Sequence, residues 1–203
     1  MEVIIADKSH IIYADIICNT IADSANVRGT GIAKRTPEYI IQRMENGNAV
    51  IALDGGMFVG FCYIEKWDHG KFVANSGLIV HSDYRGKGVA KLIKKKIFEH
   101  SRTKFPEAKV FSITTGLPVM KINSDLGYKP VTFSELTKDQ SFWKGCQTCK
   151  NYDVLQRTSQ SMCLCTGMLY DPNVKLETKK VKENVFKRLK SIKQTLFLKN
   201  NKK

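Results

Sequence analysis

Long apolar segments are missing from this sequence. Its hydrophobic stretches are short and interrupted by charged residues, which predicts that no segment crosses a membrane as a helix. The first residues, Met1–Asp7, also lack the basic start and the long apolar core of a secretory signal peptide. We therefore expect a cytoplasmic protein, and the reducing environment there argues against disulfides among its six cysteines.

Acidic residues are scarce, since 19 Asp and Glu stand against 33 Lys and Arg, for a net charge of +14. Residues 174–203 hold ten Lys and one Arg against two Glu, a net +9, which leaves +5 for the other 173 residues. No zinc-finger spacing, helix-turn-helix signature or aromatic-studded basic sheet accompanies this charge, so a nucleic-acid partner is not expected. We interpret the basic tail as a solvated helical segment with one apolar stripe, formed by Val181, Val185, Leu189, Ile192 and Leu196.

The remaining composition is that of a globular chain. Hydrophobic residues make up 42% of the 203 residues, which suits one domain with or without an appendage. Apolar patterning and turn residues predict strands over 3–6, 49–53, 58–67, 72–81, 109–114 and 128–133, and helices over 9–25, 37–45, 87–102 and 117–126. Ser9 is the expected N-cap of the first helix. This order predicts an α/β fold of the mixed-sheet (α+β) kind.

The most informative segment runs from Leu78 to Ala90. An apolar, β-prone run is followed by a polar turn, a basic loop spaced by Gly86 and Gly88, and then a helical pattern. Free main-chain N–H groups and the helix dipole make such a helix start an anion site, and the glycines let a phosphate approach the backbone. The loop lacks the Gly-Lys-Ser/Thr ending of a Walker loop and the third glycine of a dinucleotide fingerprint.

These residues resemble the pyrophosphate loop of the GNAT superfamily of acyl-CoA-dependent N-acyltransferases. Arg85, Gly88 and Ala90 fill the family pattern Arg/Gln-x-x-Gly-x-Gly/Ala, and the run Asn123–Pro130 resembles the family's closing helix-to-strand element. The resemblance covers roughly Met1 to Phe133. It implies the GNAT fold, whose sheet splays between the fourth and fifth strands, and acetyl-CoA as co-substrate, an anion that suits the modest positive charge of this part of the chain. The cofactor-binding residues it implies are Leu78, Ile79, Val80, Arg85, Gly86, Lys87, Gly88, Val89, Ala90 and Asn123.

Acyl transfer to an amine needs a base for the amine, a donor for the oxyanion and a proton for the thiolate. The resemblance places the oxyanion donor at the main-chain N–H of Val80. Many relatives have a tyrosine acid four residues before the closing glycine, but counting back from Gly127 reaches Asn123, which can only hydrogen-bond the sulfur. No glutamate lies in the fourth strand, so the candidate bases are Glu65, on the neighbouring strand, and His81. The alternatives are a surface charge and a turn-stabilising histidine.

A glycine-broken basic loop between the first two helices overhangs the acceptor site in this fold. Its cations, Arg28, Lys34 and Arg35, suit an acceptor with a carboxylate, because a guanidinium binds that group bidentately. Thr115 adds a polar group after the fifth strand. A solvated basic loop is the equal alternative.

Four cysteines beyond residue 134 have metal-knuckle spacing. Cys146-x-x-Cys149 and Cys163-x-Cys165 supply four thiols for a structural zinc site, and free thiols or a redox pair are the alternatives.

The sequence therefore predicts three parts: an acetyltransferase-like domain over 1–133, a cysteine-containing extension over 134–173 and the basic helical tail over 174–203. The expected function is transfer of an acetyl group from acetyl-CoA to the primary amine of a small acceptor, for example an amino acid such as glutamate. Protein or peptide N-acetylation and a non-catalytic CoA-binding or zinc-stabilised interaction module stay open. The oligomeric state also stays open, with a homodimer as one alternative.

Overall fold

The computed structural model describes residues 1–28 and 33–174. Contacts divide the chain into a compact unit, Met1–Pro172, and a second unit, Asn173–Lys203, of which only residues 173 and 174 are described. The predicted helical stripe of the tail lies outside the described residues. Within them, every helix is too short or too polar to span a bilayer.

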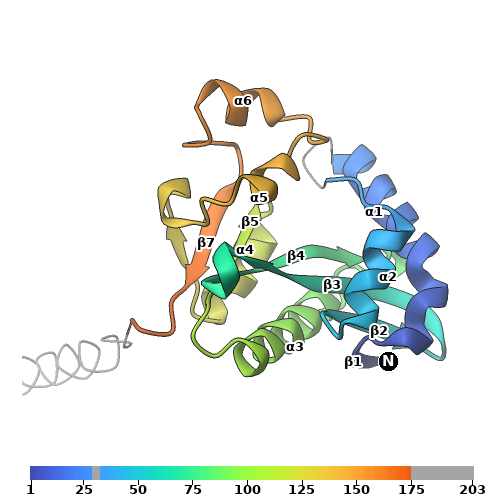
Figure 1. The fold of residues 1–203 in the computed structure, drawn as a ribbon. Helices are drawn as coiled ribbons and strands as arrows, with labels where there is room; N and C mark the ends of the chain where they lie inside the picture. Colours follow the sequence, from blue (N-terminus) through green and yellow to red (C-terminus); the bar gives the residue numbers. More distant parts are fainter. Residues whose placement is uncertain (29–32, 175–203) are drawn as a thin grey trace, which may run out of the picture. The chain divides into compact units, whose positions relative to one another are not determined.

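A seven-stranded mixed sheet organises the compact unit (Figure 1). Its order is β1-β2-β3-β4-β5-β7-β6, and all neighbours are antiparallel except β4 and β5, which are parallel. The strands are β1 (Glu2–Ile5), β2 (Ala49–Asp54), β3 (Met57–Trp67), β4 (Phe72–Val80), β5 (Lys109–Thr114), β6 (Lys129–Val131) and β7 (Thr166–Tyr170). The mixed α/β prediction is confirmed.

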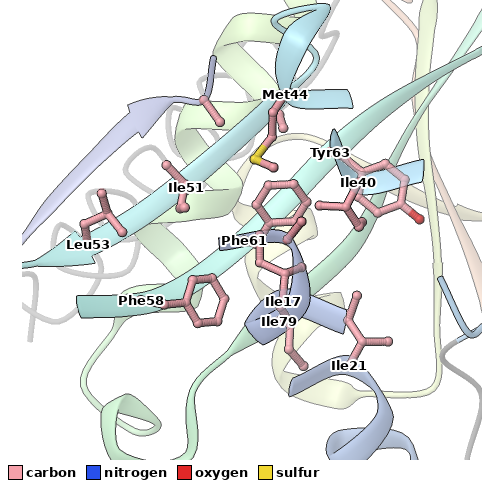
Figure 2. Close-up of a cluster of buried hydrophobic side chains, with 13 residues drawn as sticks. Ile17, Ile21, Ile40, Met44, Ile51, Leu53, Phe58, Phe61, Tyr63 and Ile79 are labelled. Atoms are coloured by element: carbon pink, nitrogen blue, oxygen red, sulfur yellow. The ribbon is translucent and has the colours of Figure 1, made fainter. Parts of the chain in front are cut away.

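Helices cover both faces of this sheet. The first pair, α1 (Ala14–Arg28) and α2 (Pro37–Glu45), contributes Ile17, Ile21, Ile40 and Met44 to a core with Phe61 and Tyr63 of β3 (Figure 2). The second pair, α3 (Val89–Lys104) and α4 (Leu117–Asp125), packs its apolar side on the other face, against residues that include Cys62 and Ile64. Since side chains of a strand alternate between faces, odd-numbered residues of β3 from Phe61 onward belong to the α1/α2 side and even-numbered ones to the α3 side.

The first helix begins later than the sequence indicates. Residues Lys8–Tyr13 form a 3-10 turn, and α1 starts only at Ala14. Asp7, not Ser9, caps the turn, because its carboxylate accepts the main-chain N–H of Ser9 at 2.8 Å. The expected apolar face is therefore broken: Ile17 and Ile21 are buried, but Ile12 is 76% exposed.

β4 and β5 pair over only part of their length. Phe72–Ala74 pairs with Lys109–Phe111, after which Asn75–Val80 and Ser112–Thr114 diverge. A register shift between β3 and β4 lies at the same level, beside Gly77, which has a φ of +65°. A Cβ on Gly77 would lie 2.1 Å from Cε1 of Tyr63, so both the backbone conformation and the available space require glycine there.

The segment expected as an extension is an insertion within the fold. Residues 132–165, here called the β6–β7 insertion, connect two strands that pair with each other, and β7 then lies between β5 and β6. The insertion carries the short helices α5 (Gln140–Lys144) and α6 (Tyr152–Arg157), with Phe142, Trp143 and Leu155 buried against Phe111 of β5. The structure thus differs from the expected boundary at residue 134, because the sheet is complete only with β7.

Replacing Gly77 by alanine tests the bulge. Gly77→Ala should lower the free energy of unfolding by about 3 kcal/mol, since it adds a left-handed strain and a contact with Tyr63. Gly55→Ala is the matched control: Gly55 has a φ of +56° but open space around its Cβ position, so only about 1 kcal/mol is expected. Equal losses in urea unfolding would show that the bulge relaxes around the methyl group.

Candidate acetyl-transfer site

A cavity of about 430 Å³ lies where β4 and β5 diverge. Its wall combines Asn75–Leu78 of β4, Ser112–Thr114 of β5, Glu65 of β3 and Lys94 of α3. Side chains of α2 and of the β6–β7 insertion complete it. The cavity therefore has contributions from both faces of the sheet, since Glu65 belongs to the α1/α2 side and Lys94 to a helix on the other side.

On the α1/α2 side, Glu65 lies in a network of hydrogen bonds. Its side chain is 6% exposed, and its Oε1 accepts a hydrogen bond from the hydroxyl of Tyr39. Burial first, and then the charge of Glu65 and the hydrogen bond donated to it, raise the pKa of Tyr39 to about 12. Tyr39 therefore keeps its proton at neutral pH and donates it in a hydrogen bond to the buried Glu65 side chain.

Two guanidinium groups line the same cavity as this side chain. Nε of Arg35 donates to the hydroxyl of Tyr63 at 2.7 Å, and its Nη1 donates to the carbonyl of Lys34 at 3.0 Å. Burial acts to lower the pKa of Arg35, but Tyr63 and Glu65 raise it on balance, so Arg35 is a cation. Arg43 lies over the Tyr39 ring at 4.3 Å, and its buried Nε has no hydrogen-bond partner among the described residues.

The predicted anion loop has the expected backbone. Gly86 and Gly88 have φ values of +77° and +80° with open space beside them, and α3 begins directly after Gly88. Within the described part of the chain, no protein acceptor takes the main-chain N–H groups from Gly86 to Ala90. This leaves a row of donors at a helix start, the arrangement that binds a phosphate.

The Arg85 side chain has two hydrogen-bond partners within the protein. Its Nε donates to the carbonyl of Val80 at 3.1 Å, and its Nη2 donates to Oγ of Ser24 on α1 at 2.7 Å. The side chain therefore joins the loop to β4 and α1. Lys87 lies over the Tyr84 ring at 5.2 Å, on a second hollow beside the loop.

The structure places the predicted site residues in different parts of the site, some on the cavity wall and others outside it. Leu78, Glu65, Arg35 and Thr115 line the cavity, whereas Ile79, Val80 and residues 85–90 lie along β4 and the α3 start outside its lining. His81 lines the second hollow with Lys87, and its Nδ1 is 3.8 Å from Oδ2 of Asp83. Lys34 is exposed and donates its main-chain N–H to Oγ1 of Thr148 at 3.2 Å. Arg28 ends α1, and its side chain lies outside the described part.

Asn123 does not lie on the cavity wall. It is 0% exposed, and its side-chain nitrogen and oxygen have no hydrogen-bond partner among the described residues. Its main-chain carbonyl accepts the N–H groups of Leu126 and Tyr128, each at 3.0 Å, and so closes α4. The contact with a CoA sulfur expected of Asn123 remains a prediction.

The four cysteines gather on the cavity wall, but they do not fit a metal. Cys146, Cys149, Cys163 and Cys165 all line the cavity, yet the described residues contain no group of three or more His, Cys, Asp or Glu side chains placed to hold an ion. Because no such group is found among the described residues, the zinc prediction is not supported. Burial first, and then the charges of the neighbouring cysteines, raise the pKa of Cys146 to about 11 and that of Cys165 to about 12.

Three cavity residues were missed in the sequence. Tyr39 and Arg43 are four residues apart on α2, so their side chains share one face, and only that spacing could have indicated a pair. Lys94 follows Ala90 by four residues on the apolar stripe of α3, where a lysine is out of place.

The comparisons with known proteins agree with this architecture. The model of the acetyltransferase (GNAT) family matches residues 18–118. No curated protein matches the chain. N-acetylglutamate synthase from Neisseria gonorrhoeae, solved with coenzyme A and N-acetyl-glutamate, is similar with a TM-score of 0.59 and 12% identity, over 85% of this chain and 35% of that chain. This chain therefore spans about a third of that synthase.

Two solved structures match along nearly their whole length. Rv2747 from Mycobacterium tuberculosis, solved in complex with CoA, has a TM-score of 0.59 and 14% identity, over 84% of this chain and 99% of that one. The putative acetyltransferase yncA from Salmonella typhimurium, solved with acetyl-CoA, has a TM-score of 0.57 and 14% identity, over 86% and 95%. A sheet that opens between two parallel strands beside a glycine-rich helix start is thus an acetyltransferase fold. The chain belongs to the acetyltransferase (GNAT) family.

The Tyr39–Glu65 contact predicts loss of stability in alkali. Unfolded tyrosine has a pKa of about 10, whereas that of folded Tyr39 is about 12. The folded state thus holds a proton that the unfolded state loses, and the free energy of unfolding falls as pH rises from 10 towards 12. Tyr39→Phe should reduce this fall by about 1 kcal/mol, a figure that is lowered for the partial solvent exposure of the side chain. Urea unfolding at several pH values measures it.

Tyr13→Phe is the matched control, since the Tyr13 hydroxyl donates to the carbonyl of Gly56 at 2.7 Å and not to a carboxylate. If the free energy of unfolding of Tyr39→Phe fell with rising pH as steeply as that of the unmodified chain, the Tyr39 hydroxyl would not be the group that holds the extra proton.

Proposed function

We propose that this chain transfers an acetyl group from acetyl-CoA to the primary amine of a small acceptor that carries a carboxylate, such as an amino acid of the glutamate type. The observation that carries the proposal is the cavity at the opening of β4 and β5, which contains a buried carboxylate and two guanidinium groups close to the phosphate-type loop of α3.

Acetyl-CoA would bind along the opening between the strands. Its diphosphate would accept hydrogen bonds from the main-chain N–H groups of Gly86–Ala90, which the described residues leave without acceptors. The thioester arm would follow the unpaired part of β4 into the cavity, with the main chain of Leu78–Val80 beside it. The carbonyl oxygen would receive the N–H of Val80 as it becomes an oxyanion.

Glu65 is the proposed general base. It lies in the cavity, whereas His81 lies in the second hollow, beside the loop. The amine approaches from the α1/α2 side, its nitrogen attacks the thioester carbon, and Glu65 accepts the proton that the nitrogen loses. The hydrogen bond from Tyr39 fixes the carboxylate, so the oxygen that does not accept it can face the amine.

Arg35 and Arg43 are the proposed anchors of the acceptor carboxylate. Arg35 is held by Tyr63 and by the Lys34 carbonyl through Nε and Nη1, which orients the rest of its guanidinium group. Arg43 has a buried Nε without a partner among the described residues. A carboxylate would supply charge-assisted hydrogen bonds to both groups.

The activity is tested by thiol release. The chain is incubated with acetyl-CoA and a panel of amino acids, amines without a carboxylate, polyamines and peptides, and free CoA is measured with a thiol reagent. Release that is fastest with acidic or neutral amino acids is expected. Release with peptides alone would favour protein acetylation, and tight acetyl-CoA binding without any release would favour a binding module.

Removing the proposed base should slow the chemical step. Glu65→Gln keeps the shape and the hydrogen bond from Tyr39 but cannot take a proton, so kcat should fall about 100-fold with acetyl-CoA binding unchanged. The exposed Glu45 on the same side of the sheet provides the control variant, Glu45→Gln. Wild-type kcat in Glu65→Gln, together with a large loss in His81→Gln, would transfer the role to the histidine.

Removing the proposed anchor should act on binding of the acceptor. Arg35→Met should raise KM for a carboxylate-bearing acceptor about 30-fold and change that of a simple amine much less. Lys34→Met, at an exposed neighbouring cation, is the control. Equal changes for both kinds of acceptor would mean that Arg35 shapes the site without contacting the carboxylate.

A further inference from the structure

Lys94 is a buried lysine without a protein partner. It is 0% exposed, and its Nζ has no hydrogen-bond partner among the described residues. It sits on the core-facing stripe of α3, with Ile93 and Ile97, and it lines the cavity at the β4–β5 opening. An ammonium group removed from water in this way destabilises the fold unless something supplies a counter-charge or an acceptor.

The surroundings of Nζ are apolar or aromatic. The Tyr128 ring lies 5.5 Å away, and the thiol of Cys62 is the titratable neighbour whose charge acts on the lysine. Tyr128 is itself fixed, because its hydroxyl donates to Asn75, whose amide donates to Oγ of Ser101 at 2.7 Å. Tyr128, Asn75 and Ser101 are thus hydrogen-bonded to one another and not to Lys94, which lines the cavity.

The position of Lys94 along the cavity identifies what it faces. It lies six positions after Gly88, about 9 Å further along the helix axis, so it is not one of the loop residues that would hold the diphosphate. Cys62, its neighbour, donates from Sγ to the carbonyl of Ser76 at 3.2 Å, which places Lys94 at the level of the bulge in β4. Glu65 pairs with Ala74 at the next level and points to the opposite face of the sheet.

We propose that Lys94 is the proton donor to the CoA sulfur as the thioester breaks. This inference rests on the proposed function. The thioester then lies between two groups on opposite faces of the sheet, with the amine and Glu65 on one side and the sulfur and Lys94 on the other. Lys94 also supplies the acid that Asn123 cannot provide, because Asn123 carries no dissociable proton and lies off the cavity wall.

The step balances in atoms and charge. After the amine has attacked and Glu65 has taken its proton, the C–S bond of the tetrahedral intermediate breaks, and its electron pair goes to sulfur. A proton moves from Nζ of Lys94 to that sulfur, so CoA leaves as the thiol and Lys94 becomes a neutral amine. Once the product has left, Glu65 releases its proton to water and Lys94 regains one from water. Burial lowers the pKa of Lys94, which makes it a stronger acid than a lysine in water.

Lys94→Met tests this role, because methionine has a similar length and no charge. With acetyl-CoA, kcat should fall about 100-fold, whereas the melting temperature should rise by about 5 °C because an unpaired buried charge is removed. With an acetyl thioester of an acidic aryl thiol, which leaves without protonation, the variant should match the wild type. The exposed Lys96 on the same helix provides the control variant, Lys96→Met.

The pH profile gives a second readout. The wild-type kcat should fall at alkaline pH as Lys94 loses its proton, and this limb should vanish in Lys94→Met. The other titratable groups that face it titrate higher: burial raises the pKa of Cys62 to about 11 and that of Tyr128 well above its usual value. Wild-type kcat in Lys94→Met, or an equal loss with both thioesters, would overturn the assignment.

Binding of CoA itself separates this inference from the proposed function. When bound CoA brings its thiol against the buried Nζ, the pair is left with one proton in place of two, held on sulfur or on nitrogen. Calorimetry of CoA in two buffers at pH 8 should therefore detect proton release with the wild type and none with Lys94→Met. If the wild type binds CoA but acetylates nothing on the panel, the proposed function fails, and this measurement still decides on Lys94. Equal proton release by both proteins, or no binding of CoA at all, would overturn the placement of the sulfur.

Discussion

The site depends on hydrogen bonds that β4 and β5 do not make. Parallel neighbours normally continue their ladder to the strand ends, but here pairing stops after Ala74 and Phe111. Gly77, in a left-handed conformation against the Tyr63 ring, turns β4 away at that level. Main-chain groups that a closed sheet would satisfy are thereby left for a ligand, and the resulting opening is large enough to hold one.

Opposite faces of the sheet supply groups of opposite charge to this opening. The alternation of side chains along β3 sends Tyr63 and Glu65 to α1 and α2, and Cys62 to α3. The carboxylate of Glu65 has a tyrosine partner, while Nζ of Lys94 lies near an aromatic ring and a thiol. In the proposed mechanism, a group in the opening meets a base from one side and an acid from the other.

The sequence was most informative where local chemistry determines the structure. The left-handed glycines of residues 85–90 and the mixed order of strands and helices follow from turn chemistry and periodicity, which act over a few residues. Glu65 and Arg35 were selected by residue type and by resemblance, and the structure places both on one cavity wall. The protein partners of the Arg85 side chain, Ser24 and Val80, come from other elements, so local chemistry could not indicate them.

Long-range packing explains the remaining differences. Nothing local indicates that Thr166–Tyr170 returns to lie between β5 and β6, so the preceding residues were taken for an extension. Cysteine spacing suggested a metal, but burial beside Phe142 and Leu155 makes these thiols part of an apolar wall. Lys94 was not singled out, although its place on the apolar stripe of α3 was visible in the sequence.

The β6–β7 insertion has a consequence for how such a chain can diversify. Its two ends are fixed next to each other, because Val131 pairs with Gly167. Residues between them can be lengthened, shortened or exchanged at little entropic cost and without altering the register of the sheet. Since these residues form one wall of the cavity, acceptor preference could evolve as a separate module while the thioester machinery on β4 and α3 stays constant.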